Sequence, residues 1–74
     1  MTYLATFCSQ FDSILASRRL HTAGAGNPQL MPVPRSVSTT CGTCVQFEWE
    51  GEPPAVDGAE RLYRKDGAGW QPVK

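Results

Sequence analysis

The stretch LMPVPRSVSTTCGTC, residues 30–44, organises the chain around it. It begins as a short apolar segment that two prolines stiffen, and it then passes one cation, Arg35. Hydroxyl side chains and a glycine surround two thiols, Cys41 and Cys44, and the stretch contains no carboxylate. A loop rich in hydrogen-bond donors and free of acids favours an anion, and a thiolate is an anion. We therefore predict a reactive cysteine site, with a polar hairpin that carries incidental free thiols as the alternative.

The size and charge of the chain exclude several classes of function. Seventy-four residues form one small domain, and a homodimer is one way to cover the apolar surface that so small a core leaves over. Seven basic residues balance seven acidic ones, which disfavours binding to nucleic acid. No segment is apolar enough to span a membrane and the first residues do not resemble a signal peptide, so we expect a cytoplasmic protein. Three cysteines, an odd number, fit a disulfide scaffold poorly.

The N-terminal half reads as a strand, a helix and a second strand. Residues 3–8 are apolar enough for a strand, and Ser9 then begins a helix over residues 10–22 that ends near Gly24. Residues 29–33 form the second strand, which the prolines place at a sheet edge. Short connections predict a right-handed crossover whose two strands run parallel.

The helix has two candidate buried sides. Phe11 and Leu15 lie on one side, and the small residues Ser13 and Ala16 lie on another with Leu20. Large apolar side chains usually belong to the core, whereas small ones allow a helix to lie close to a sheet. The sequence leaves both orientations open.

The C-terminal half reads as strands without a helix. Residues 45–50 alternate between apolar and polar side chains, which is typical of a half-buried strand. Residues 51–59 contain Pro-Pro and Asp-Gly and form a linker, and residues 60–74 form a hairpin around an Asp-Gly turn. We therefore predict a two-layer α+β fold in a single domain, with a core over residues 3–50.

This topology predicts where the reactive residues meet. The end of the first strand, the start of the helix and the end of the second strand share one edge of the sheet. Helix N-terminal amides and Arg35 would stabilise a thiolate at that edge, and Cys8 comes within reach of Cys41 or Cys44.

The motif from Cys41 to Cys44 has the spacing of a thiol–disulfide pair and also of half a zinc site. The other half of a zinc site would need Cys8 and His21, but His21 lies late in the helix and suits a solvated helix end better. A thioredoxin-like motif would open a helix, whereas Cys44 leads into a strand. We expect no bound metal and no cofactor.

The pattern YLATF, then Ser9 and a helix, then LMPVPR and STTCG resembles a family of small bacterial selenium/sulfur carrier-like proteins. The resemblance covers about residues 3–50, and its most specific part is Pro-x-Pro-Arg followed by hydroxyl residues and Cys-Gly. It implies a carrier that holds its cargo as a persulfide or selenosulfide on Cys41, with Arg35, Thr40 and Gly42 around it. It also implies partner proteins that donate and accept sulfur or selenium.

Two departures from the family pattern matter. Cys44 is a second thiol where an apolar residue is expected, which keeps a Cys41–Cys44 redox switch as an alternative function. The linker at residues 51–58 replaces more regular structure, which predicts a truncated ferredoxin-like fold without its second helix. A non-catalytic interaction module is a further alternative, and an enzyme in the ordinary sense is not expected because no histidine or paired carboxylates accompany Cys41.

Overall fold

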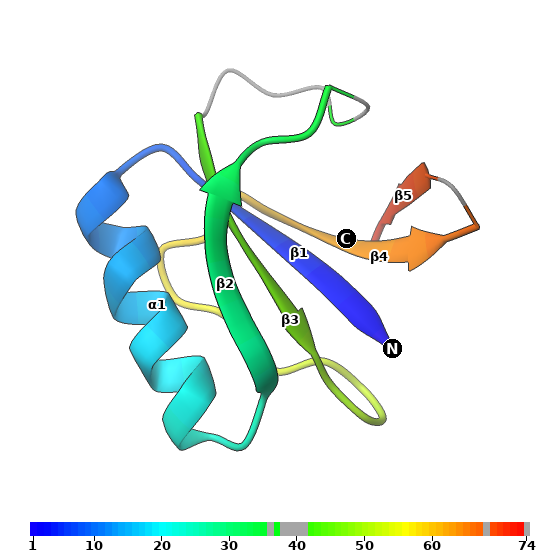
Figure 1. The fold of residues 1–74 in the computed structure, drawn as a ribbon, viewed down its shortest axis with the longest axis horizontal. Coiled ribbons are helices and arrows are strands. Elements are labelled where there is room, and N and C mark those ends of the chain that lie inside the picture. Colours follow the sequence, from blue (N-terminus) through cyan, green and yellow to red (C-terminus); the bar gives the residue numbers. More distant parts are fainter. Residues whose placement is uncertain (36, 38–41, 68, 74) are drawn as a thin grey trace.

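The computed structural model describes residues 1–35, 37, 42–67 and 69–73. Within these residues the chain forms one helix and five strands, drawn in Figure 1. In chain order they are β1 (Thr2–Phe7), α1 (Gln10–Thr22), β2 (Gly26–Pro32), β3 (Thr43–Glu48), β4 (Arg61–Asp66) and β5 (Gly69–Pro72). The predicted α+β class is confirmed, and the predicted helix bounds agree with those of α1.

The five strands form one sheet in the order β2-β3-β1-β4-β5, and every neighbouring pair is antiparallel. β1 and β2 therefore run parallel to each other, as predicted, but β3 lies between them and separates them. β2 is an edge strand, which explains how it accommodates prolines that lack an N–H donor. The ferredoxin-like comparison stays a prediction.

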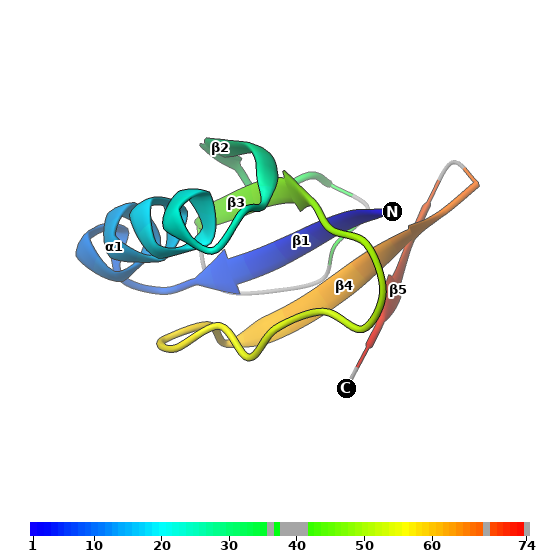
Figure 2. The same ribbon diagram turned by 90° about the horizontal axis from the view of Figure 1, so that it is seen from below.

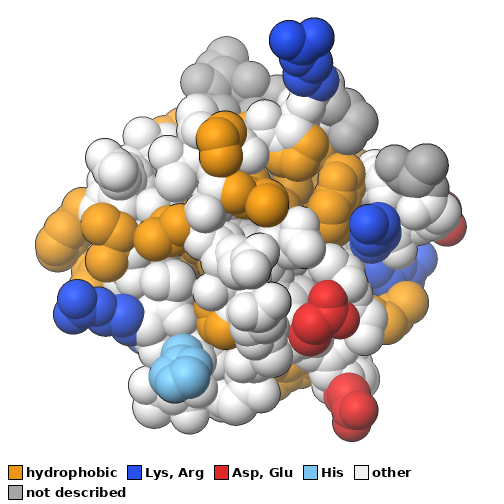
Figure 3. All heavy atoms as spheres, viewed as in Figure 1, with side chains coloured by type: hydrophobic (Ala, Val, Ile, Leu, Met, Phe, Trp, Pro, Cys, Tyr) orange, Lys and Arg blue, Asp and Glu red, His pale blue; other side chains and the backbone are white. Residues whose placement is uncertain are grey.

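The helix α1 lies along one face of the sheet and forms the second layer (Figure 2). Its buried side consists of Ser13, Ala16 and Leu20, while Phe11 is 67% exposed. Small side chains bring the helix close to the strands, and this decides the orientation that the sequence left open. Apolar side chains consequently remain on the outer side of α1, visible at the left of Figure 3.

Both ends of α1 are capped by groups that the sequence signals. At the N-terminus the Ser9 hydroxyl accepts a hydrogen bond from the Asp12 amide at 3.4 Å. At the C-terminus the Ala23 amide donates to the Arg19 carbonyl at 2.9 Å, and Gly24 follows with a φ of 97°. Glycine adopts this left-handed conformation without strain, so it ends the helix.

The core is divided by the sheet into two clusters. The cluster under the helix combines alternate residues of β1 and β3 with the buried side of α1 and the residue before β2: Tyr3, Ala5, Phe7, Ala16, Leu20, Ala25, Val45 and Phe47. The cluster on the opposite face is smaller: Leu4, Val37, Cys44 and Tyr63, with Trp70 packed against it. Alternate residues of β1 therefore face opposite sides of the sheet, and Trp70 covers part of the second cluster.

The second strand differs from the prediction at its start. We expected a strand over residues 29–33, whereas β2 begins at Gly26 and ends at Pro32. Asn27 has a φ of 49°, and the register between β2 and β3 shifts between Gly26 and Gln29. An irregularity of this kind lets a segment with a proline join the sheet, so Gly26 and Pro28 stop the helix without preventing a strand.

The linker after β3 contains no helix, and the C-terminal hairpin is formed by β4 and β5. The linker runs beside α1 on the same face of the sheet (Figure 2), where Asp57 forms an ion pair with Arg19 at 3.5 Å. Gly58 lies against the first turn of the helix, because a Cβ added there would come within 3.3 Å of Asp12.

Candidate cysteine site

Five elements end or begin at one end of the strands, which we call the cysteine edge. β1 and β2 end there, and α1, β3 and β4 begin there, at the top of Figure 1. The pairing register defines this edge, because Thr43 pairs with Pro32 on one side and with Phe7 on the other. Thr6 in turn pairs with Arg61 at the start of β4. The crossover topology predicted this edge from the sequence.

The predicted site residues fall into two groups. Four of them are described: Cys8 follows β1, Arg35 follows β2, Gly42 precedes β3, and Cys44 is the second residue of β3. Cys41, like Thr40 and the two residues before it, lies outside the described residues.

Cys44 is a core residue. Its side chain is fully buried in the cluster with Leu4 and Tyr63, and its Sγ donates to the carbonyl oxygens of Met31 at 3.4 Å and Pro32 at 3.6 Å. Burial raises the pKa of the Cys44 thiol from 9.0 to about 11. At neutral pH this thiol is protonated and has no access to solvent, so it is unsuited to act as a nucleophile.

Cys8 lies directly after β1 and before the helix cap, in an exposed position. It is disulfide-bonded in the structure, whereas Cys44 is a free thiol. The sequence predicted that Cys8 would come within reach of the motif, and this stays a prediction.

Arg35 follows β2 at the same edge and is exposed. It lies in a turn that is closed by a hydrogen bond from the Val37 amide to the Pro34 carbonyl at 3.0 Å. Val37 is buried against the sheet face that carries Cys44, so it anchors the connection between β2 and β3. Among the described residues no carboxylate forms an ion pair with Arg35.

The fold also brings a carboxylate to this edge, which the sequence reading missed. The Glu60 amide donates to the Thr6 carbonyl at 2.7 Å, and the buried Thr6 hydroxyl donates to Glu60 Oε1 at 3.2 Å. The stretch 30–44 is free of acids, but the start of β4 supplies one from elsewhere in the chain. The position of Glu60 beside Thr6 follows from the pairing of β1 with β4. The sequence of the Pro-rich linker does not predict the register of that pairing.

A zinc site built on Cys8 and His21 does not fit this geometry. The two residues lie at opposite ends of α1, a helix about 20 Å long by its thirteen residues. Within the described parts of the chain, no group of three or more His, Cys, Asp or Glu side chains is placed to hold a metal ion.

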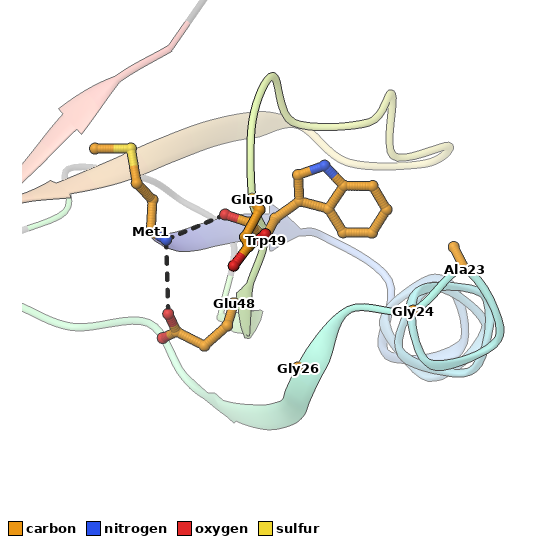
Figure 4. Close-up of a pocket in the computed structure, with 7 residues that line it drawn as sticks. All are labelled: Met1, Ala23, Gly24, Gly26, Glu48, Trp49 and Glu50. Carbon is orange, nitrogen blue, oxygen red and sulfur yellow. Dashed lines mark hydrogen bonds and ion pairs between the residues drawn. The ribbon is translucent and has the colours of Figure 1, made fainter.

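The opposite edge of the sheet carries a hollow of about 490 Å³, shown in Figure 4. It lies where β1 begins and β3 ends, and its lining residues are Met1, Ala23, Gly24, Gly26, Glu48, Trp49 and Glu50. The Met1 amino group donates to the Trp49 carbonyl at 3.1 Å and lies 3.9 Å from a Glu48 carboxylate oxygen. None of the lining residues of this hollow is a cysteine.

A comparison with protein families identifies one match. A family model described as "Putative Se/S carrier protein-like" matches residues 2–62 of the 74-residue chain. The resemblance inferred from the sequence is thereby confirmed, and the match extends beyond residue 50 into β4. No curated protein and no solved structure matches the chain. No helix among the described residues has the length and apolar character needed to cross a membrane.

Proposed function

The chain belongs to the Se/S carrier-like family, and from this premise we propose that it carries sulfur or selenium covalently on Cys41, as a persulfide or selenosulfide. The matched residues 2–62 contain Cys41 and the elements that meet at the cysteine edge. The family name supports a carrier, and the assignment to one cysteine is our own inference.

The observation that carries the assignment to Cys41 is the burial of Cys44. Of the two thiols in the Cys-x-x-Cys motif, Cys44 is fully buried and has a pKa of about 11. A carrier thiol must reach the active site of a partner and react as a thiolate. That requirement leaves Cys41, which follows hydroxyl residues and precedes the exposed Gly42. A Cys41–Cys44 switch would require Cys44 to leave the core.

The edge supplies the environment that such a thiolate needs. Arg35 offers a positive charge without a carboxylate partner among the described residues, and the N-terminus of α1 adds the positive end of the helix dipole. A Cβ added to Gly42 would meet no atom within 4 Å, so the chain beside the carrier cysteine is open to an approaching partner. Glycine also permits backbone conformations that other residues avoid.

The proposed reaction is a sulfur transfer between thiols. The Cys41 thiolate attacks the terminal sulfur of a persulfide on a donor enzyme, a bond forms from Cys41 Sγ to that sulfur, and the donor cysteine leaves as a thiolate. An acceptor protein then removes the cargo by a second attack. We place this exchange in the cytoplasm, where thiols are kept reduced, and its partners are the enzymes that donate and accept sulfur or selenium.

Loading by a cysteine desulfurase with free cysteine tests the proposal. We expect the intact mass of the reduced protein to increase by one sulfur atom, which peptide mapping locates on Cys41. The Cys41→Ser variant should gain nothing, and the matched Cys44→Ser variant should load as the unmodified chain does. Absence of an adduct from both the unmodified chain and its Cys8→Ser variant, under conditions that load an established carrier, would refute the carrier function.

A further inference from the structure

The pairing register places Cys8 at the end of the ladder that joins β1 to β3. The ladder ends with Phe7 opposite Thr43. Cys8 follows Phe7 in the sequence, and Gly42 precedes Thr43. Directly opposed residues of antiparallel strands have Cα atoms about 4.5–5.5 Å apart, and disulfides join Cα atoms about 4.4–6.8 Å apart. Cys41 precedes Gly42 in the sequence and lies outside the described residues.

The bonding states of Cys8 and Cys44 indicate which cysteine is the disulfide partner of Cys8. The chain has three cysteines, Cys8 is disulfide-bonded, and Cys44 is free. Cys44 also pairs with Thr6 inside the ladder, with its thiol hydrogen-bonded to carbonyl oxygens of β2. We propose that Cys8 forms a reversible disulfide with Cys41, and that in the carrier it is the resolving cysteine that discharges the cargo. The discharge step rests on the proposed function, whereas the pairing does not.

The discharge step balances without an outside oxidant. The Cys8 thiolate attacks Cys41 Sγ, an Sγ–Sγ bond forms, and the bond from Cys41 Sγ to the cargo atom breaks. The cargo leaves with the electron pair as hydrosulfide or hydroselenide, and the proton from the Cys8 thiol passes to solvent. The two cysteine sulfurs are oxidised together by two electrons, which the cargo atom gains. A dithiol reductant of the thioredoxin class then reduces the Cys8–Cys41 disulfide and becomes a disulfide itself.

This chemistry distinguishes the two candidate cargoes. Thiol exchange is faster when the leaving group is the weaker base, and hydroselenide is a weaker base than hydrosulfide. Selenium should therefore leave faster than sulfur by the same route. The chain would then deliver its cargo as the reduced hydride anion, and its consumer would be an enzyme that uses hydroselenide or hydrosulfide directly.

The pairing is tested first, without any cargo. We expect the reduced chain, treated with oxidised glutathione and digested under non-reducing conditions, to yield a peptide linking Cys8 to Cys41. The Cys8→Ser variant should yield none, and Cys44→Ser, the matched control, should behave as the unmodified chain. Glutathione adducts on Cys41 with no internal link in the unmodified chain would overturn the pairing.

The discharge is tested on protein loaded by a desulfurase with cysteine and then separated from the donor. A sulfide-specific fluorescent probe should show release from the unmodified chain and from Cys44→Ser, with a Cys8–Cys41 disulfide left behind. Release from Cys8→Ser and Cys8→Ala should be about tenfold slower or more, because the neighbouring thiolate is lost. Equal release from all variants would overturn the resolving role and leave the carrier intact. Failure of every variant to load would overturn the carrier and the discharge together, while the glutathione experiment still decides the pairing.

Discussion

Thr6 and Cys44 lie directly opposite each other in the β1–β3 ladder, and both side chains are fully buried. This pair fixes the second thiol of the Cys-x-x-Cys motif inside the strand and leaves the first thiol before the strand begins. Cys44 is therefore held in the core by its own strand, although the sequence motif that contains it resembles a redox pair.

The first prediction concerns the structural role of Cys44. Replacement of Cys44 by Ala removes a buried sulfur and should lower the free energy of unfolding by about 1–2 kcal/mol, measured by urea denaturation under reducing conditions. Sulfur loading of the folded variant should match that of the unmodified chain. In the native protein at neutral pH, Cys44 should also resist alkylation by iodoacetamide until urea unfolds the chain. Rapid alkylation of native Cys44 would contradict its assignment to the core.

The second prediction is a loss of stability at alkaline pH. Burial raises the pKa of Cys44 to about 11 in the folded chain, against 9.0 for an exposed thiol. The folded state therefore holds a proton that the unfolded state loses between these values, so unfolding becomes easier as the pH rises. The protonated Cys44 thiol contributes at most about 2–3 kcal/mol to the free energy of unfolding. This contribution is fully present below pH 9 and is lost as the pH rises to about 11.

A change of pH acts on the whole chain, so the comparison needs a matched variant. The Cys44→Ala chain differs from the unmodified chain only in lacking the buried thiol. The free energies of unfolding of the two reduced chains should converge between pH 9 and pH 11. A constant difference over that range would show that Cys44 ionises normally.

The third prediction concerns the orientation of α1. Ala16 is buried against the sheet, so Ala16→Leu should overpack the interface and lower the free energy of unfolding by about 1–3 kcal/mol. Phe11 is 67% exposed, so Phe11→Ser should change it by less than about 0.5 kcal/mol. Urea titrations at low protein concentration measure both. A larger loss of unfolding free energy in Phe11→Ser than in Ala16→Leu would place the large residues in the core. A loss of stability in Phe11→Ser that depends on protein concentration would indicate that Phe11 is covered in a homodimer.

The sequence predicted most of the local structure because the local signals agree with one another. Ser9, Asp12 and Gly24 mark the ends of α1, and the helix bounds followed from them. The hairpin of β4 and β5 followed in the same way from its Asp-Gly turn. The buried side of α1 did not follow, because it depends on how closely a helix can approach the sheet, and large and small residues offered competing faces.

The sequence predicted that Cys8 and Arg35 would share one end of the sheet, but it did not predict which other groups lie there. Chain order alone places Cys8 and Arg35 at one edge once the crossover is assumed. The separation of β1 from β2 by β3 depends on long-range pairing, and so does the arrival of Glu60 beside Thr6. The burial of Cys44 also required the register, because alternation alone did not tell which face of β3 would be covered by Leu4 and Tyr63.

The fourth prediction concerns Arg35 as the cation of the carrier site. Arg35 is exposed at the cysteine edge, and no ion pair to a carboxylate neutralises it among the described residues. A cation near a thiol favours its thiolate form, so Arg35→Gln should slow alkylation of Cys41 at pH 7 by about 2–5-fold. The rate is measured by mass spectrometry with iodoacetamide on the Cys8→Ser, Cys44→Ser background, where Cys41 is the remaining thiol.

The matched control is Arg18→Gln, which removes an exposed arginine near the other end of α1 and should leave the rate unchanged. Because Arg35 faces solvent, 1 M salt should also reduce the difference between Arg35→Gln and the background chain, since the screening length is about 3 Å at that ionic strength. An effect of equal size in both arginine variants would indicate that net charge acts on Cys41 rather than Arg35 itself. An unchanged rate in both would remove Arg35 from the site and leave the N-terminus of α1 as the group that favours the thiolate.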